Sequence, residues 1–276
     1  MTLVLLEAIL VATVALAVLV GWLARRWFTR GDESAVGEVD RISESLAFVG
    51  GALGIIVGLL LVFAVQHFED SKAAARDEAG YAITLFNAVG PYPAAERAAL
   101  RHDVICLMRS TATDDWAMAA RDDLTGSENT FAWANRIQRA VEALPQEKPA
   151  EASNHYFVTE ASLNLDRARQ QRLLLGSPEI PPIVWIVIFT GIFAFVAMLE
   201  FHLGSRRSLR VIAIGGVLLV MIVMVYALYE LDRPYSGWSG SSLQPIAMET
   251  SLRQLQDGFV REDWASCPQL AQPRSD

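Results

Sequence analysis

Four long apolar runs alternate with polar stretches along the chain. They cover residues 3–23, 46–65, 180–199 and 211–228, and Glu7 is the one charged residue within them. A bilayer core of about 30 Å requires about 20 apolar residues in a helix, so each run is long enough to cross a membrane. Because a backbone in lipid must satisfy its own hydrogen bonds, the pattern predicts four transmembrane helices.

Between the second and third runs, apolar residues recur at three- and four-residue steps. This helical period predicts helices over about residues 43–88, 94–120, 131–145 and 153–175, and one more over about residues 245–263. The alternation typical of strands is absent from the sequence. The predicted fold class is therefore all-α: a polytopic membrane protein with four transmembrane helices and a helical extramembrane domain.

The same pattern predicts five regions. The first transmembrane helix and a short cytoplasmic loop take residues 1–47, and the second transmembrane helix takes residues 48–66. A helical extramembrane domain follows over residues 67–179. The third and fourth transmembrane helices take residues 180–229, and a C-terminal tail takes residues 230–276.

Arginines in the two short loops indicate the membrane orientation. They are Arg25, Arg26, Arg30 and Arg41 after the first run, and Arg206, Arg207 and Arg210 before the fourth. Short basic loops stay in the cytoplasm, so both termini and the extramembrane domain are predicted to lie outside a bacterial-type inner membrane. Five acids in the first loop leave the opposite orientation open. The arginines follow the first run, which favours a retained helix over a cleaved signal peptide.

Composition narrows the function classes. Hydrophobic residues make up 53% of the chain and charged residues 20%, which argues against an ordinary soluble enzyme. Residues 69–179 include 12 basic and 17 acidic residues, so a nucleic-acid partner is not expected. The sequence lacks the motifs of zinc proteases, phosphate-binding loops and serine hydrolases. We therefore predict no enzyme, no cofactor and no metal site.

Small residues are concentrated in the second apolar run. Gly50, Gly54 and Gly58 recur every four residues, Gly51 lies beside them, and Phe63 follows near the end of the run. Glycines at this spacing let helix backbones approach closely. Three interpretations stay open: packing within one chain, packing between subunits, and a narrow pore lined by this helix.

Polar residues follow directly after this run. They are Gln66, His67, Glu69 and Asp70. One interpretation is a solvated rim at the membrane surface, and the other is a vestibule that selects or senses ions. An unperturbed histidine titrates near neutral pH, so His67 could couple pH to opening.

Arginines and cysteines of the extramembrane region supply two further hypotheses. Arg167, Arg169 and Arg172 either pair with acids such as Asp166 and those near Glu69, or form an anion-attracting ring in an oligomer. Cys106 and Cys267 both fall outside the membrane in the predicted topology. Because disulfides persist in oxidising compartments, they could form a disulfide that tethers the tail.

Five stretches in this order resemble a family of bacterial membrane proteins known as bestrophin-like. They are FVGGALGI at residues 48–55, FAVQHFE at 63–69, ARQQRL at 168–173, PPIVW at 181–185 and LDRPYSG at 231–237. The resemblance covers about residues 45–255, and its motif residues include Arg169, Arg172, Asp232, Arg233, Pro234 and Gly237.

The resemblance implies kinship to bestrophins, which are pentameric anion channels with four membrane helices per subunit. Their second helix lines the pore, so the glycine face from Gly50 to Gly58 and the end from Phe63 to His67 would form the constriction here. The expected function is an oligomeric anion channel in a lipid bilayer. The alternative is a non-catalytic membrane scaffold or signalling protein whose extramembrane domain binds a partner.

Overall fold

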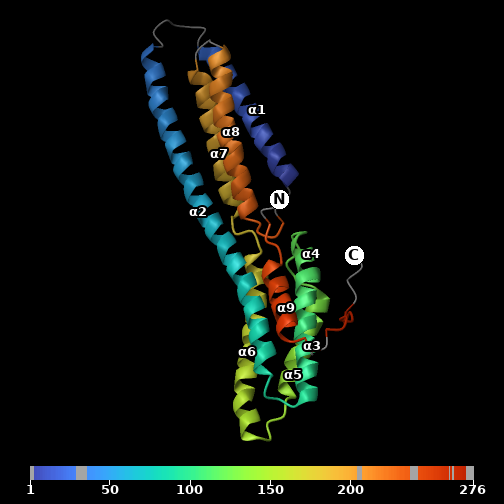
Figure 1. Cartoon of the computed structure of the whole chain (residues 1–276). Helices are drawn as coiled ribbons and strands as arrows, with labels where there is room; N and C mark the ends of the chain where they lie inside the picture. Colours follow the sequence, from blue (N-terminus) through green and yellow to red (C-terminus); the bar gives the residue numbers. More distant parts are fainter. Residues whose placement is uncertain are drawn as a thin grey trace. The chain divides into compact units, whose positions relative to one another are not determined.

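The computed structural model describes residues 3–28, 36–203, 207–236, 242–260, 262 and 264–271, and all secondary structure within these ranges is helical (Figure 1). The helices are α1 (Leu3–Phe28), α2 (Val36–Ala88), α3 (Ala94–Ser110), α4 (Trp116–Ala119), α5 (Glu128–Glu142), α6 (Pro149–Leu175), α7 (Pro182–His202), α8 (Arg207–Leu231) and α9 (Ile246–Gly258). A π-helical turn, η2 (Thr111–Asp115), joins α3 to α4. The predicted all-α fold class is confirmed.

Four of these helices are long and apolar enough to cross a membrane. Their spans are Val4–Trp27, Ser43–Ala88, Pro182–His202 and Val211–Leu231. Each contains one of the apolar runs, or nearly all of it, so the predicted transmembrane helices form as helices. The second span is longer than a bilayer requires, because α2 continues through the polar residues that follow its apolar run.

The described chain divides into two compact units, which we name the membrane unit and the helical unit. The membrane unit comprises Met1–Val65 and Glu179–Tyr229, and the helical unit comprises Gln66–Pro178 and Glu230–Asp276. The C-terminal segment therefore packs with the helical unit, although its sequence follows the last membrane helix.

Small residues set the packing within the membrane unit, where α1 lies against α7 (Figure 1). A Cβ added at Gly21 would lie 2.6 Å from the carbonyl oxygen of Ala197, so glycine permits the two backbones to approach at this point. A Cβ added at Gly191 would lie 2.8 Å from Leu53 Cδ1, which packs α7 against α2 in the same way.

The helical unit has a conventional apolar core. Its buried side chains come from α2, α3, α5, α6 and α9, and include Leu85, Phe86, Val104, Ile105, Trp133, Ile137, Val158, Leu165, Met248 and Leu255. Burial of each such aliphatic or aromatic side chain contributes roughly 1.5–3 kcal/mol. This core fixes α2, α3 and α6 against one another, and those elements carry the charged side chains described below.

Several element boundaries differ from the sequence prediction, and α5 covers Glu128–Glu142 instead of about residues 131–145. Helix α2 begins at Val36 instead of near residue 43, and α9 ends at Gly258 instead of near residue 263. Helix α6 begins at Pro149, four residues earlier than predicted, because proline suits the first turn of a helix. Glu151 also accepts a hydrogen bond from the Lys148 backbone N–H, which caps this early start.

Candidate functional site

A π-helical turn positions the first acid of the site. Helix α3 does not continue regularly into α4, because the Trp116 N–H bonds to the carbonyl oxygen of Thr111, five residues earlier. Such single-turn insertions often occur at functional positions. This one places Asp115 in the interior, while its neighbour Asp114 accepts hydrogen bonds from Ser110 and Asn129 at 2.8 Å each.

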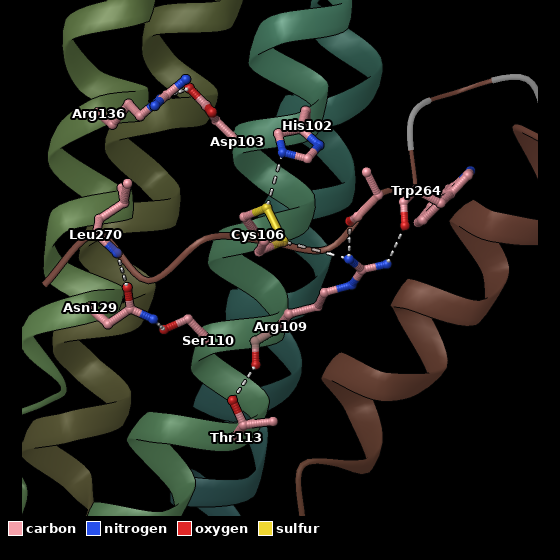
Figure 2. Close-up of a disulfide and its surroundings, with 12 residues drawn as sticks. His102, Asp103, Cys106, Arg109, Ser110, Thr113, Asn129, Arg136, Trp264 and Leu270 are labelled. Atoms are coloured by element: carbon pink, nitrogen blue, oxygen red, sulfur yellow. Dashed lines mark hydrogen bonds and ion pairs between the residues drawn. A yellow bond between two sulfur atoms is a disulfide. The ribbon is translucent and has the colours of Figure 1, made fainter. Parts of the chain in front are cut away.

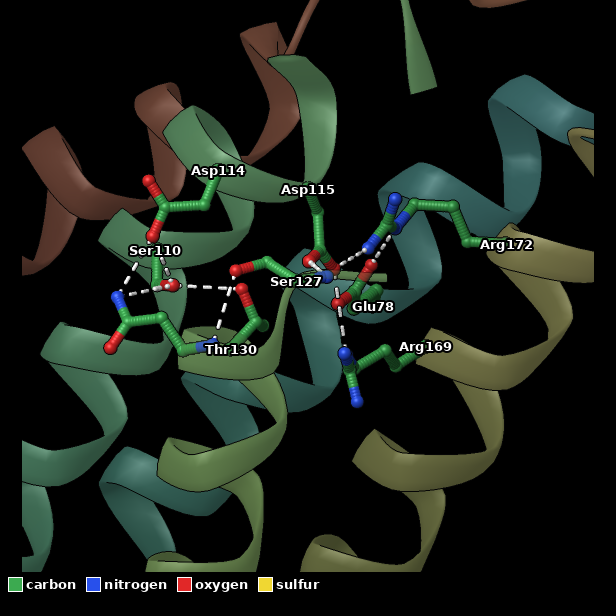
Figure 3. Close-up of polar contacts among 9 residues, drawn as sticks. Glu78, Ser110, Asp114, Asp115, Ser127, Thr130, Arg169 and Arg172 are labelled. Atoms are coloured by element: carbon green, nitrogen blue, oxygen red, sulfur yellow. Dashed lines mark hydrogen bonds and ion pairs between the residues drawn. The ribbon is translucent and has the colours of Figure 1, made fainter. Parts of the chain in front are cut away.

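Two acids and two arginines meet in the interior of the helical unit, and we call this set the ion cluster (Figure 3). It consists of Glu78 from α2, Asp115 from η2, and Arg169 and Arg172 from α6. Arg172 Nη2 donates to Asp115 Oδ2 at 2.7 Å, and Arg172 Nε donates to Glu78 Oε2. Arg169 Nε lies 3.5 Å from Asp115 Oδ2. Glu78, Asp115 and Arg172 are each 1% exposed, so water does not screen these pairs.

Two aromatic side chains cover one side of the ion cluster. The guanidinium carbon of Arg172 lies 4.8 Å from the centre of the Trp116 ring, in a cation–π contact. The Tyr235 ring packs edge-on against Trp116 with centroids 5.6 Å apart, and the Tyr235 hydroxyl donates to the Ser71 carbonyl oxygen at 3.5 Å. The aromatic contact and the two ion pairs therefore both fix the position of the Arg172 side chain.

The loop before α5 closes another side of the ion cluster. The Ser127 backbone N–H donates to Asp115 Oδ1 at 2.7 Å. Gly126 has a φ of +79°, a conformation that glycine adopts without strain. A Cβ added there would lie 3.0 Å from Arg169 Nη2, so this close approach also favours glycine.

The charges of the ion cluster balance. Burial alone would lower the pKa of Arg172, but the carboxylates of Glu78 and Asp115 raise it above its ordinary value, so the guanidinium stays protonated. Burial raises the pKa of Glu78, and the Arg172 guanidinium opposes that shift. Burial likewise raises the pKa of the Tyr235 phenol, which therefore stays neutral. The paired charges connect α2, η2 and α6, and removal of one partner would leave another charge buried and unpaired.

The segment after α8 docks beside the ion cluster. Arg233 pairs with Asp122, and Ser236 Oγ donates to Asp122 Oδ1 at 2.6 Å. Asp122 has a φ of 63°, so these two contacts hold a residue in the left-handed region. Pro234 is buried, and its carbonyl oxygen accepts a hydrogen bond from Leu243 N–H at 2.7 Å.

The structure thus brings together motif residues that are far apart in sequence. Arg169 and Arg172 lie in the ion cluster, Arg233 and Pro234 lie in the segment that docks beside it, and Asp232 is buried in that same segment. Gly237 lies outside the described residues. Arg169 and Arg172 pair with acids, as one hypothesis held, but their partners are Glu78 and Asp115. Arg167 is exposed and does not belong to the ion cluster. Asp166 instead accepts a hydrogen bond from Gln170, and Glu69 pairs with Lys72.

Sequence reasoning missed both acids of the ion cluster. A signal for Glu78 was present, because it lies on a helical stripe of α2 whose other members, Ala75, Ala79 and Ala82, are small and buried. A single charge in such a stripe indicates a buried pair. No comparable signal exists for Asp115, since the π-helical turn shifts it away from the face that a regular helix would give it.

The residues proposed as a vestibule differ in exposure. Gln66, Glu69 and Asp70 are exposed. His67 is buried, and its carbonyl oxygen accepts a hydrogen bond from Ser71 Oγ at 2.8 Å. Their role in ion selection stays a prediction.

The four glycines in the apolar run of α2 differ in what surrounds them. A Cβ added at Gly50 would lie 2.6 Å from Phe195 Cε2, so Gly50 packs within the membrane unit. At Gly51, Gly54 and Gly58, a Cβ would meet no atom of the described chain within 4 Å. These three glycines form what we call the open glycine face.

The two cysteines form a disulfide. Cys106 Sγ is bonded to Cys267 Sγ at 2.01 Å, across 161 residues of sequence (Figure 2). The hypothesis that a disulfide tethers the tail is confirmed.

Comparison with known proteins identifies structures with the same fold and a family to which the sequence belongs. Crystal structures of a bacterial bestrophin homologue from Klebsiella pneumoniae share the fold: one variant is 16% identical over 91% of this chain and 99% of that chain, with a TM-score of 0.65. A second variant is 14% identical over 90% of this chain and 99% of that chain, also with a TM-score of 0.65. No curated protein matches in sequence. The family described as Bestrophin-like domain matches residues 11–245, and the chain therefore belongs to that family.

Proposed function

We propose that this protein is an anion channel made by a ring of identical subunits, with the membrane part of α2 lining the path. The open glycine face carries this proposal. Gly51, Gly54 and Gly58 lie on a membrane-spanning helix, and no part of the described chain covers them.

Glycine is poorly suited to face lipid alone. It offers no side chain for dispersion contact with acyl chains, whereas it lets a neighbouring backbone come close. Gly50 makes such a contact within the chain, against Phe195. The open glycine face is suited to a similar contact with another copy, or to a narrow path at the centre of several copies.

A ring is the arrangement that closes such a face. Identical subunits assemble most often with closed rotational symmetry, which brings the same face of each copy toward one axis. Phe63 lies one to two turns beyond Gly58 on α2 and is 63% exposed, but at 100° per residue it lies on a different side of the helix from the open glycine face. The exposed Gln66, Glu69 and Asp70 would then form the vestibule. The choice of anions rests on membership of the family.

We place the protein in the inner membrane of a bacterial cell, with the helical unit outside. The arginine-rich short loops support this orientation, because such loops stay in the cytoplasm. The disulfide between Cys106 and Cys267 supports it independently, since disulfides persist in oxidising compartments.

A partner-binding scaffold is the second candidate function. The observation that favours it is a set of exposed aromatic side chains in the helical unit: Phe131 on α5 and Tyr156 and Phe157 on α6, which are 58%, 67% and 58% exposed. Exposed aromatic side chains are enriched where proteins bind one another.

Chloride flux from proteoliposomes tests the channel. We expect Gly54→Leu to lower flux at least about tenfold, because a bulky side chain would enter the path, an effect of about 1.4 kcal/mol or more on the barrier. The control is Gly215→Leu, at a glycine of α8 that also has no neighbour within 4 Å of an added Cβ in the described chain. It should conduct like the wild type.

The oligomer mass of the wild type, Gly54→Leu and Gly215→Leu is measured in one detergent before reconstitution into vesicles. Equal flux from Gly54→Leu and wild-type vesicles would exclude α2 as the pore lining. Tight vesicles with correctly inserted wild-type oligomer would exclude the channel and favour the scaffold.

A further inference from the structure

We propose that Cys106, Cys267 and His102 bind a zinc ion when the disulfide is reduced, so that the metal replaces the disulfide as the crosslink between α3 and the C-terminal segment. This site was not predicted from the sequence. It does not depend on the proposed channel function.

The three ligand atoms already lie together (Figure 2). One ligand atom from each of His102, Cys106 and Cys267 lies within 4.8 Å of the others. His102 Nε2 is 3.5 Å from Cys106 Sγ, because residues four apart share one face of a helix. The His102 ring also packs edge-on against Trp133, with centroids 6.5 Å apart, which helps to orient it.

The distances suit a tetrahedral metal after a small movement. Zinc binds thiolate sulfur at about 2.3 Å and imidazole nitrogen at about 2.0 Å, which separates two ligand sulfurs by roughly 3.8 Å and a sulfur from a nitrogen by roughly 3.5 Å. The distance from His102 to Cys106 already matches. The sulfurs need to separate after reduction, and Cys267 can move because it lies in a non-helical segment.

Contacts on both sides of Cys267 keep its segment close to α3 and α5 after reduction, while the cysteine itself can shift. Arg109 Nη1 donates to the carbonyl oxygen of Ala265 at 2.7 Å, and Arg109 Nη2 donates to that of Trp264 at 3.3 Å. Beyond the cysteine, Leu270 N–H donates to Asn129 Oδ1 at 2.9 Å. The thiol therefore stays near its partners, which lowers the entropic cost of closing a metal site.

Arg109 also contacts one of the ligand atoms. Its Nη1 donates to Cys267 Sγ at 3.5 Å. Hydrogen bonds to ligand atoms orient those atoms and strengthen metal sites. Arg109 thus binds the C-terminal segment and also orients the Cys267 sulfur, which is one of the proposed zinc ligands.

The chemistry proceeds in two balanced steps. A dithiol reductant supplies two electrons and two protons, which break the bond between the sulfurs and leave two thiols, while the reductant becomes a disulfide. A zinc ion then binds both sulfurs and the neutral imidazole of His102, and two protons leave the thiols. Water completes the four ligands, as in zinc sites with three protein ligands.

The test uses the full-length protein in detergent. One sample stays oxidised, and a second is reduced with a phosphine and desalted without oxygen. Cobalt(II) is titrated first, because its thiolate bonds give visible and near-ultraviolet absorption, and zinc then competes for the site. We expect one cobalt ion per chain in reduced protein and none in oxidised protein.

Variants identify the ligands. We expect Cys267→Ser to abolish the thiolate absorption, and His102→Ala to weaken zinc binding at least about tenfold. His155→Ala is the matched control, since His155 is a half-buried histidine on α6 and should leave binding unchanged. Equal metal binding by oxidised and reduced protein, or unchanged binding in His102→Ala, would overturn the proposal.

Hydrogen exchange gives a readout that does not depend on the metal's colour. In reduced protein, zinc should slow exchange in peptides covering residues 264–271, as the disulfide does in oxidised protein. The same zinc should leave exchange in Cys267→Ser unchanged. Exchange that is insensitive to zinc in the reduced wild type would show that the metal does not replace the crosslink.

Discussion

The membrane unit and the helical unit are built on opposite principles. Helices of the membrane unit leave large apolar side chains outward, such as Ile55, Val62 and Leu219, each more than 60% exposed. The helical unit buries an apolar core and also charged side chains, among them the four of the ion cluster. The helical unit is therefore specified by contacts within this chain, whereas the membrane unit requires lipid or other copies to cover it.

The two units differ in this way because water surrounds the helical unit and lipid surrounds the membrane unit. Removal of apolar surface from water drives the packing of the helical unit. Lipid supplies no such force, so helices of the membrane unit pack through close approach at small residues, as at Gly21 and Gly191. Close approach at glycines therefore brings the helices of the membrane unit together, whereas the helical unit is held by its apolar core and its buried charges.

Removal of one arginine of the ion cluster should have the largest effect on stability. Arg172→Ala leaves Glu78 and Asp115 buried without their main cation, which costs about 3–5 kcal/mol. The free energy of unfolding of the helical unit can be measured by hydrogen exchange. Arg167→Ala, at an exposed arginine of the same helix, is the control and should change it by less than about 0.5 kcal/mol. Equal losses in the two variants would mean that the cluster does not clamp the unit.

Glycine substitutions in the helical unit should have an intermediate effect. A Cβ added at Gly176 would lie 2.6 Å from Leu124 Cδ2 and 3.1 Å from the Tyr235 ring. We therefore expect Gly176→Ala to cost about 1–3 kcal/mol in the same exchange measurement.

The matched control is Gly80→Ala, where an added Cβ meets nothing within 4 Å in the described chain. Alanine is favoured over glycine within a helix by roughly 0.5–1 kcal/mol, so this variant should be as stable as the wild type or more so. Stabilisation by both substitutions would show that Gly176 is not closely packed.

The smallest effect should be a change in pH dependence. Asp103 on α3 is buried, and its Oδ2 accepts a hydrogen bond from Arg136 Nε at 2.9 Å (Figure 2). Burial raises the pKa of Asp103 above its usual 3.8, and Arg136 opposes that shift. The folded protein therefore holds this proton to a higher pH than the unfolded chain, so the contribution of Asp103 to stability falls as pH rises through that window.

Asp103→Asn removes this titration and keeps the shape of the side chain. Unfolding free energies measured upward from about pH 4 should fall less steeply for the variant than for the wild type. Parallel curves for the two proteins would mean that Asp103 has an ordinary pKa in the folded state.

The sequence predicts the helices well because each has a strong local signal. Runs of about 20 apolar residues identify the membrane helices, and Gly90 with the prolines on either side of Tyr92 marks the end of α2. The disulfide was one hypothesis from the sequence, suggested by the predicted compartment. The ion cluster was only half predicted: Arg169 and Arg172 stand in a motif, but their partners depend on tertiary packing that no local pattern encodes.

The π-helical turn makes the ion cluster sensitive to chain length as well as to residue identity. Its five residues occupy more chain than a regular turn requires, and Asp115 reaches Arg172 from its last position. The π-helical turn takes up one extra residue, so deletion of Ala112 would convert it to a regular turn and leave Asp115 on the side of Arg172. A second deletion would instead rotate all that follows by about 100°. The acid would then point elsewhere although every member of the cluster was still present. Insertions and deletions in η2 therefore show how the ion cluster depends on the number of residues in the turn, which side-chain substitutions do not show.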